Sequence, residues 1–356
     1  MVERRVTLAD VARRAGLSTT TASLVLNDRK DTRISSEAAT RVRAAAAELG
    51  YRPNPVALML STSRSETIGF ISDSVATTRY ASALIHGALS EALVRRHILL
   101  IAETGGDPAN ELETLESLLS RYVDGIIFAF ERSHEVELPR QGIPVPHVVL
   151  NASISGLEAS ILPDEFTAGK DVVRILGDAG IRNGVVLLGR QFNQVPDRLF
   201  TTTVRRRMEG IRVGLELQGL TLAAELGCTV WKPDAGYRAM TQFLSTGTPF
   251  EAIICLNDRL AFGAYQALAE YGLEVPRDVS IVSFDDDEIS QYLRPQLTSV
   301  ALPYEAMGVL AVELILSGRT QPFEHLVPMP VRFRGSVRPL FPSLNPPVGF
   351  ESITEN

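Results

Sequence analysis

The sequence predicts a small all-α N-terminal domain followed by a larger two-lobed α/β domain built on doubly wound parallel sheets. Apolar residues recur at helical spacing in the first 50 residues, whereas from residue 66 short apolar runs alternate with amphipathic stretches. The charge also changes sign along the chain. Residues 1–65 carry 11 Lys and Arg against 6 Asp and Glu, a balance of +5, and the remainder of the 356 residues carries −12. A basic module joined to an acidic body is typical of a protein in which only the first part meets phosphates.

Three short helices are expected in the basic module. The first has one apolar face, formed by Leu8, Val11, Ala12 and Ala15. Thr7 is a suitable N-cap for it, and Gly16 ends it. A second helix starts after Ser18, and a third runs from a cap at Ser35 to Gly50. Two helices joined by a short turn that contains Gly, with a third packed against them, make a helix-turn-helix unit.

Residues 54–65 are predicted to form a hinge helix and a polar linker. Asn54 is a good N-cap, and Pro55 suits the first helical position because its missing N–H is not needed there. A helix of about six residues is far below the ~12–15 that are stable alone. We therefore expect this helix to fold only with a partner.

From residue 66 the chain predicts two parallel sheets covered by helices, because the strands are apolar on both faces and alternate with helical stretches. The apolar runs are Ile68–Ile71, Ile98–Ala102, Gly125–Ala129, Val148–Leu150, Val185–Leu188, Ile253–Leu256 and Ile281–Phe284. The helical stretches include 83–95, 110–121, 166–179, 204–218, 236–245 and 259–271. The tail at 341–356 is expected to be irregular, and its lack of heptad leucines gives no sign of a coiled coil.

Polar side chains follow several of these runs. They are Asp73, Asn151, Asn257, Asp258 and Asp285. Ligands of open parallel sheets bind beyond the carboxyl ends of the strands, and amides with carboxylates suit a ligand rich in hydroxyls or ring nitrogens. Each residue alone is also explained by a turn or a helix cap, an explanation that we favour for any single position. Their agreement predicts a binding crevice.

Three further side chains are candidates for the same crevice. Trp231 is the only tryptophan and precedes a turn, so it either packs in a core or stacks on a sugar or base. Tyr80 is open to the same two interpretations. Arg207 ends a run of three arginines, which is explained either by a solvated surface or by one arginine that turns inward to a ligand oxygen.

The sequence argues against an enzyme, a metal site and an exported protein. It contains no phosphate-binding loop, no Gly-x-Ser-x-Gly elbow and no paired histidines. The carboxylates of 285–287 are best explained as a strand-end turn. Cys228 and Cys255 lie in apolar surroundings, which fits two reduced thiols. Without a membrane span or a signal sequence, a cytoplasmic protein is predicted.

Together these residues resemble the lac-repressor/galactose-repressor family of bacterial regulators over about residues 6–338. The resemblance rests on several strings in order, which are Thr7–Ser18, Ala22–Asn27, Gly50–Asn54, Val123–Ile127, Asn257–Ala261, Val275–Asp286 and Leu297–Val300. The family fold implies three crossings between the lobes, near 162, 293 and 323. It therefore implies a helix-turn-helix domain at 1–53, a hinge at 54–65 and an effector domain at 66–340. The first lobe then comprises about 66–162 and 294–322, and the second about 163–293 and 323–340.

The resemblance also assigns roles to residues. Family effector contacts map onto Tyr80, Asn151, Arg207, Trp231, Asn257 and Asp285, and the strand-end argument adds Asp73. For DNA, Ser18, Thr21, Ser23 and Asn27 match positions that hold phosphates, and Thr19, Thr20 and Leu24 match positions that read bases. With these we group Thr7 and Asn54. Leu60 matches the hinge leucine that enters the minor groove.

Two features depart from the family pattern. Leu24 stands where the family usually has arginine, so it cannot pair with guanine, although it can touch a thymine methyl. The loop of residues 28–33 is longer than usual, which changes the expected backbone contacts. Both features leave the operator sequence open.

The prediction is a homodimeric DNA-binding transcription regulator, a repressor of the lac-repressor family, that binds a near-palindromic operator and needs no cofactor. Its effector is expected to be a sugar or sugar derivative, with a nucleoside or purine second, and either release or recruitment of DNA is compatible with the sequence. The rival classes are a sugar-binding transport receptor, which shares the two-lobed body with periplasmic binding proteins, and an enzyme acting on a sugar or nucleotide. The N-terminal helix-turn-helix weighs against the first rival, and the missing catalytic motifs weigh against the second.

Overall fold

A computed structural model describes most of the chain and divides it into two units. The described residues are 6–27, 34–52, 64–74, 82–131, 133–136, 138, 142–154, 159–182, 184–193 and 201–339. Unit 1 comprises residues 1–67 with 118–124, and unit 2 comprises 68–117 with 125–356. Asn54, Leu60, Tyr80 and the tail at 341–356 lie outside the described residues, so the expectations for the hinge and the tail stay predictions.

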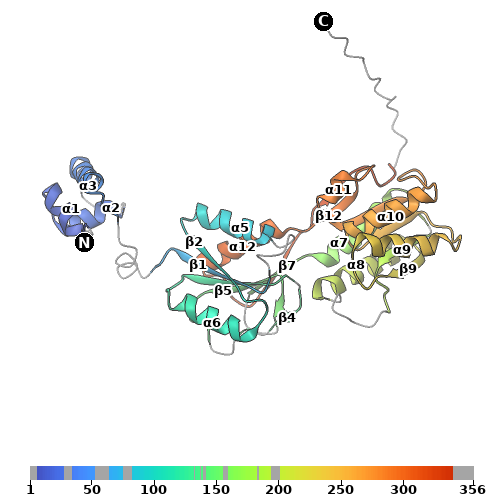
Figure 1. Cartoon of the computed structure of the whole chain (residues 1–356), viewed down its shortest axis with the longest axis horizontal. Coiled ribbons are helices and arrows are strands. Elements are labelled where there is room, and N and C mark those ends of the chain that lie inside the picture. The colour runs from blue at the N-terminus through green and yellow to red at the C-terminus, as the bar shows by residue number, and fades with distance from the viewer. Residues whose placement is uncertain are drawn as a thin grey trace, which may run out of the picture. The chain divides into compact units, whose positions relative to one another are not determined.

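Unit 1 contains the three predicted helices, α1 (Leu8–Ala15), α2 (Thr19–Leu26) and α3 (Ser36–Glu48) (Figure 1). Thr7 forms a capping box with Asp10, and Gly16 ends α1 in the left-handed conformation at φ 66°. Ser18 and Ser35 cap α2 and α3, as expected. The core between the helices consists of Val11, Ala12, Ala15, Ala22, Val25, Val42, Ala45 and Ala46. Because these side chains are small, the three helices can pack closely.

Unit 2 contains two six-stranded sheets, which we call lobe 1 and lobe 2. The sheet of lobe 1 has the order β13-β7-β5-β3-β1-β2. Its strands are β1 (Thr67–Ser72), β2 (Ile98–Glu103), β3 (Gly125–Ala129), β5 (His147–Leu150), β7 (Ala159–Pro163) and β13 (Glu324–Val327). α5 (Ser82–Val94) and α12 (Tyr304–Ser317) pack together on one face, and α6 (Pro108–Leu119) covers the other (Figure 1). A short pair, β4 (Glu135–Val136) and β6 (Ser153–Ile154), lies apart from the main sheet.

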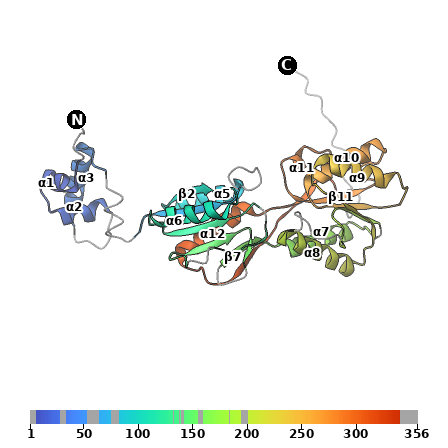
Figure 2. The ribbon, with the colours of Figure 1, turned by 60° about the horizontal axis from the view of Figure 1, so that its bottom comes forward.

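The sheet of lobe 2 has the order β14-β12-β11-β10-β8-β9. Its strands are β8 (Val185–Gly189), β9 (Leu222–Gly227), β10 (Ala252–Cys255), β11 (Ser280–Asp285), β12 (Thr298–Ala301) and the antiparallel β14 (Val331–Arg332). Its helices are α7 (Glu165–Asp178), α8 (Thr202–Gln218), α9 (Pro233–Leu244), α10 (Asp258–Glu270) and the short α11 (Ile289–Tyr292). Figure 2 shows α7 and α8 on one side of the sheet and α9 and α10 on the other. The predicted parallel sheets are confirmed.

The chain crosses between the lobes three times, but two crossings lie further along than predicted. The first, between β7 and α7, agrees with the expectation near 162. The expected crossing near 293 is wrong because β12 pairs in parallel with β11 in lobe 2. The expected crossing near 323 is also wrong because β13 pairs with β7 in lobe 1. Four-residue strands carry no local mark of the sheet they join, since strand pairing is a non-local contact.

Two glycines allow α7 and α8 to approach each other closely. A Cβ at Gly210 would meet the carbonyl oxygen of Phe166, and a Cβ at Gly169 would meet that of Arg207. The contact fixes the position of α8, the helix that carries Arg207.

No helix within the described part of the chain is both long and apolar enough to pass through a membrane.

Candidate effector site and DNA-binding surface

The centre of the candidate effector site is Arg207, which turns inward from the first half of α8. Its Nε and Nη2 donate to the two carboxylate oxygens of Glu165 at 2.6 and 2.7 Å, and Nη1 donates to the carbonyl oxygen of Leu256 at 2.5 Å. Asp285 Oδ1 lies 3.8 Å from Nη1. The guanidinium also lies over the ring of Phe284, 4.2 Å from its centroid. Arg207 is therefore not part of a solvated surface, and its contact with a ligand oxygen stays a prediction.

Asn151 and Asp285 occupy the ends of β5 and β11 with positive φ angles of 60° and 101°. Asn and Asp tolerate this region better than other non-glycine residues. The Nδ2 of Asn151 donates to the carbonyl oxygens of Phe130 and Glu131. Its Oδ1 is buried and has no hydrogen-bond partner among the described residues. A buried acceptor without a partner is costly, and a ligand hydroxyl or N–H would satisfy it.

Two carboxyl groups at the strand ends of lobe 2, Asp285 and Asp258, have raised pKa values. Burial raises the pKa of Asp285 to about 6, against the opposing effect of Arg207. Burial, and next the charge of Asp285, raise the pKa of Asp258 to about 8. The oxygens of Asp258 accept from Ser299 Oγ and the amide of Asp287, each at 2.7 Å, so this carboxyl holds the strand ends together. The cap-like explanation therefore suits Asp258, which faces protein groups.

Trp231 and Asn257 lie next to each other in lobe 2. Trp231 is half-buried, and its Nε1 donates to the carbonyl oxygen of Gly189 at 3.1 Å. Asn257 caps α10 through Oδ1, which accepts from the amide of Leu260, while its Nδ2 faces the Trp231 carbonyl oxygen at 3.4 Å. Asn257 directly follows Leu256, whose carbonyl oxygen holds Arg207. These contacts connect both residues to the arginine centre.

Asp73 lines a separate hollow of about 340 Å³ at the strand ends of lobe 1, together with Glu111, Phe130 and His134. Its Oδ1 accepts from the amides of Ser74 and Glu131, so its main observed task is to shape the turn. Glu131 is also where Asn151 donates, which links Asp73 to the rest of the site.

Sequence reasoning missed two side chains of the site. Glu165 is 1% exposed and is the main partner of Arg207. The pKa of Tyr304, at the start of α12, is raised by burial first and then by Asp285 and Glu165, while its contact with Asn151 lowers it. Tyr304 packs against the core of lobe 1, and its pKa responds to charges of lobe 2. Glu165 follows β7 closely, so the strand-end rule would have found it if Ala159–Pro163 had been recognised as a strand.

The start of α8 also contacts lobe 1. The amide of Thr202 donates to the carbonyl oxygen of Ser133 at 2.8 Å, and its hydroxyl lies 3.2 Å from that of Ser153. Arg206 pairs with Glu324 of β13 at 2.8 Å. The helix that presents Arg207 is therefore bound to both lobes.

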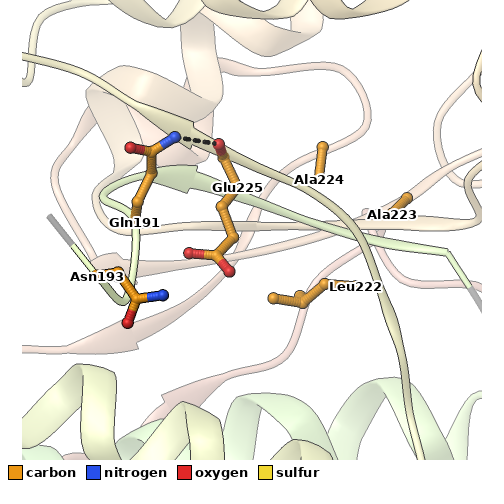
Figure 3. A pocket seen from close by; sticks show the side chains of 6 residues that line it. All are labelled: Gln191, Asn193, Leu222, Ala223, Ala224 and Glu225. Atoms are coloured by element: carbon orange, nitrogen blue, oxygen red, sulfur yellow. Dashed lines mark hydrogen bonds between the residues drawn. The ribbon is translucent and has the colours of Figure 1, made fainter.

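A second hollow, of about 500 Å³, opens at the β9 edge of lobe 2 (Figure 3). Gln191 donates to the carbonyl oxygen of Glu225 at 3.1 Å, and the other lining residues shown are Asn193, Leu222, Ala223 and Ala224. None of the predicted site residues is among the described residues that line this hollow.

The candidate DNA-binding side chains lie on α2 and its cap. Thr19 and Thr20 are exposed, and Leu24 is half-buried. Ser18 and Thr21 contact each other through their hydroxyls at 2.8 Å, and Asn27 donates to Ser23 at 3.3 Å. Thr7 is engaged in the capping box of α1. The helix α2 has no charged residue, so any base reading by α2 must use hydroxyl and methyl groups.

A helix-turn-helix unit followed by two lobes with polar groups gathered at their strand ends defines the class of ligand-controlled DNA-binding regulators. Residues 7–54 match the family of bacterial regulatory proteins, lacI family, and residues 173–337 match the periplasmic binding protein-like domain. The chain belongs to the lacI family, so it is a ligand-responsive DNA-binding transcription regulator, and the family is one of regulators, not enzymes.

Individual relatives agree with this assignment. The chain is 30% identical to the ribose operon repressor of Escherichia coli K12 over 320 residues, 89% of this chain and 94% of that protein. It is 29% identical to the HTH-type transcriptional repressor PurR of Pasteurella multocida, over 87% of this chain and 90% of that protein. The lac repressor dimer bound to operator and the anti-inducer ONPF superposes with a TM-score of 0.71 at 26% identity, over 94% of this chain and 99% of that one. The predicted family and fold class are confirmed.

Proposed function

We propose that this chain acts in the cytoplasm as a homodimeric repressor that binds a near-palindromic operator and responds to a small polar effector. The effector is a sugar or sugar derivative first, and a nucleoside or purine second. The carrying observation is the set of polar groups at the strand ends, namely Arg207 with Asp285, Asn257 beside the Leu256 carbonyl oxygen, and Asn151 with its buried Oδ1, which is unpaired within the described part of the chain. The name of the ribose operon repressor supports the first of these two effector classes.

The dimer is supported by an apolar surface on lobe 1. Large hydrophobic side chains on α5 and β2 are exposed, namely Leu89, Leu93, Val94, Ile98 and Ile101. Clusters of this kind mark association surfaces. The relative that superposes well is a dimer on its operator. Two copies joined through this surface would present two α2 helices to the half-sites of a palindrome.

The coupling between effector and DNA is proposed to pass through α8. Ligand groups that engage Arg207 act on a helix that is hydrogen-bonded to Ser133 and paired with Glu324, both of lobe 1. A change in those contacts alters lobe 1, from which the hinge at 54–65 leads to the DNA-binding domain. A coupling free energy of about 1–3 kcal/mol is typical of such regulators.

The effector part is tested by titrating sugars, beginning with D-ribose, and nucleosides while the fluorescence of Trp231 is recorded. We expect one of them to bind saturably and Arg207→Lys to weaken it at least about 10-fold, because lysine cannot reproduce the planar fork. Arg212→Lys is the matched control, since Arg212 lies on the same helix and pairs with Glu209 and Glu216 at the surface. Equal effects of the two variants would contradict the assignment of the site.

The DNA part is tested by gel retardation of fragments from the chain's own upstream region. Thr20→Ala should weaken binding, whereas Thr40→Ala, an exposed threonine of α3, should not. Affinity should fall steeply with salt because phosphate contacts release counterions. Failure to retard any such fragment at low ionic strength, with or without ligand, would refute the proposal.

A further inference from the structure

The charges at the arginine centre are unequal. One guanidinium faces two carboxylates, Glu165 and Asp285, and the exposed fractions of the three side chains are 5%, 1% and 16%. Glu165 accepts hydrogen bonds from both Nε and Nη2 of Arg207, and this bidentate pair is the strongest geometry available to the two groups. The site therefore carries an excess of negative charge within a region of low solvent access.

Three of the five N–H donors of Arg207 are already used by the protein. Nε and Nη2 are bound to Glu165, and Nη1 is bound to the Leu256 carbonyl oxygen. An anionic ligand at the guanidinium would meet the Glu165 carboxylate that is already bound there, and relief of the repulsion between the two anions would require Glu165 to be displaced. That would leave a buried carboxylate without its cation, which is strongly unfavourable.

Glu165 is free for this role because its neighbour performs the capping. The side chain of Asp164 accepts from the amide of Thr167 and caps α7, so the first residue of the helix, Glu165, can direct its carboxylate inward. The hollow in lobe 1 has the same sign of charge. Its lining includes Asp73, Glu111 and Glu135 and no Lys or Arg within the described residues.

We propose that Glu165 is a specificity-determining residue that excludes anionic ligands, so that the effector is an uncharged polyol or nucleoside and not its phosphorylated form. This inference rests on the proposed function, because it assumes that the effector binds at Arg207. Glu165 acts through Arg207 as a positioning residue. A carboxylate that served only stability would change the affinities of neutral and phosphorylated ligands equally.

The test uses matched pairs that differ by one phosphate, which are D-ribose with ribose 5-phosphate, D-glucose with glucose 6-phosphate, and adenosine with adenosine monophosphate. Binding to the full-length protein is measured by calorimetry. We expect the neutral member of one pair to bind and its phosphorylated partner to bind at least about 100-fold more weakly. In Glu165→Gln this ratio should shrink at least about 10-fold. In Glu209→Gln, which breaks a surface pair with Arg212, the ratio should not change.

Each result decides the inference. If the unmodified protein binds a phosphorylated member as well as its neutral partner, the inference is wrong while the effector site stands. If neither member of any pair binds, the proposed effector classes fail, and inorganic phosphate then decides the role of Glu165. If Glu165→Gln binds inorganic phosphate saturably and the unmodified protein does not, the role of Glu165 in excluding anions is supported. If the two proteins bind phosphate equally, or neither binds it, that role is overturned. The comparison of pairs on the unmodified protein needs no variant, so it holds even if Glu165→Gln does not fold.

Discussion

Replacing Glu165 by Gln is expected to destabilise lobe 2 by about 3 kcal/mol. The pair with Arg207 is almost fully buried, and Gln can accept only through one oxygen. The guanidinium would keep its hydrogen bond to the Leu256 carbonyl oxygen and its ion pair with Asp285, in which Nη1 and Oδ1 are 3.8 Å apart. Breaking a buried pair costs about 3–5 kcal/mol, and the remaining contact with Asp285 places this case at the lower end.

Two further variants test the same estimate: Arg207→Met, which removes the other partner of the pair, and the double variant with Glu165→Gln and Arg207→Met. Arg207→Met leaves the Glu165 carboxylate buried without a cation. Breaking a buried pair in this way costs about 3–5 kcal/mol. The double variant carries neither buried charge. Its loss should therefore be smaller than the sum of the two single losses by about 3 kcal/mol.

The assay is urea denaturation followed by the fluorescence of Trp231, which lies in lobe 2 and so reports on the lobe that contains both partners. Glu209→Gln is the control, since its pair with Arg212 is about half exposed and such pairs contribute about 0–1 kcal/mol. If Glu165→Gln cost no more than this control, or if the single losses simply added in the double variant, the buried pair would not have the energetic role argued for it.

Three further outcomes follow from the packing and charges. The pKa of Asp258 is raised to about 8 in the native state, so between pH ~4 and about 8 the native state holds a proton that the unfolded state has lost. The free energy of unfolding therefore falls as the pH rises through this window, by at most about 1.4 kcal/mol per pH unit. The free energy of unfolding is measured by denaturation at several pH values. Asp258→Asn should remove its decrease between pH 6.5 and 7.5, a range above the pKa of Asp285, and an unchanged decrease would contradict the role of Asp258. Gly210→Ala should lower the stability of lobe 2 by about 1–3 kcal/mol because the new Cβ meets the carbonyl oxygen of Phe166, and an unaltered melting temperature would contradict this. Leu93→Asp should give monomers in sedimentation and lose operator affinity while effector binding persists, and a stable dimer would show that α5 is not the interface.

The sequence predicted the fold well where local signals suffice. Caps at Thr7, Ser18 and Ser35 define the three N-terminal helices, and the alternation of apolar runs and helices defines the parallel sheets. It failed where the answer depends on pairing between distant segments. β12 and β13 are four-residue strands, and only their partners β11 and β7 show to which lobe each belongs.

The site shows the same limit. Asn151, Asn257 and Asp285 were predicted because they follow apolar runs. The structure connects Asn257 and Asp285 with Arg207 or with its neighbours, whereas Asn151 is bound to the Phe130 and Glu131 carbonyl oxygens of lobe 1. Glu165 was missed because its strand, β7, was not recognised. Even with that strand, the sequence does not say that Glu165 pairs with an arginine 42 residues away.

The two explanations offered for strand-end Asn and Asp, a turn residue or a ligand contact, are not alternatives in this structure. Asn257 caps α10 with one side-chain atom and directs the other toward Trp231. Asn151 adopts a positive φ, fixes the turn through Nδ2 and leaves Oδ1 buried without a partner among the described residues. An amide can do both because it has a donor end and an acceptor end. The residue that the backbone needs at a strand end is thus one that can also contact a ligand, and the proposed effector contact of Asn151 would satisfy its orphan Oδ1.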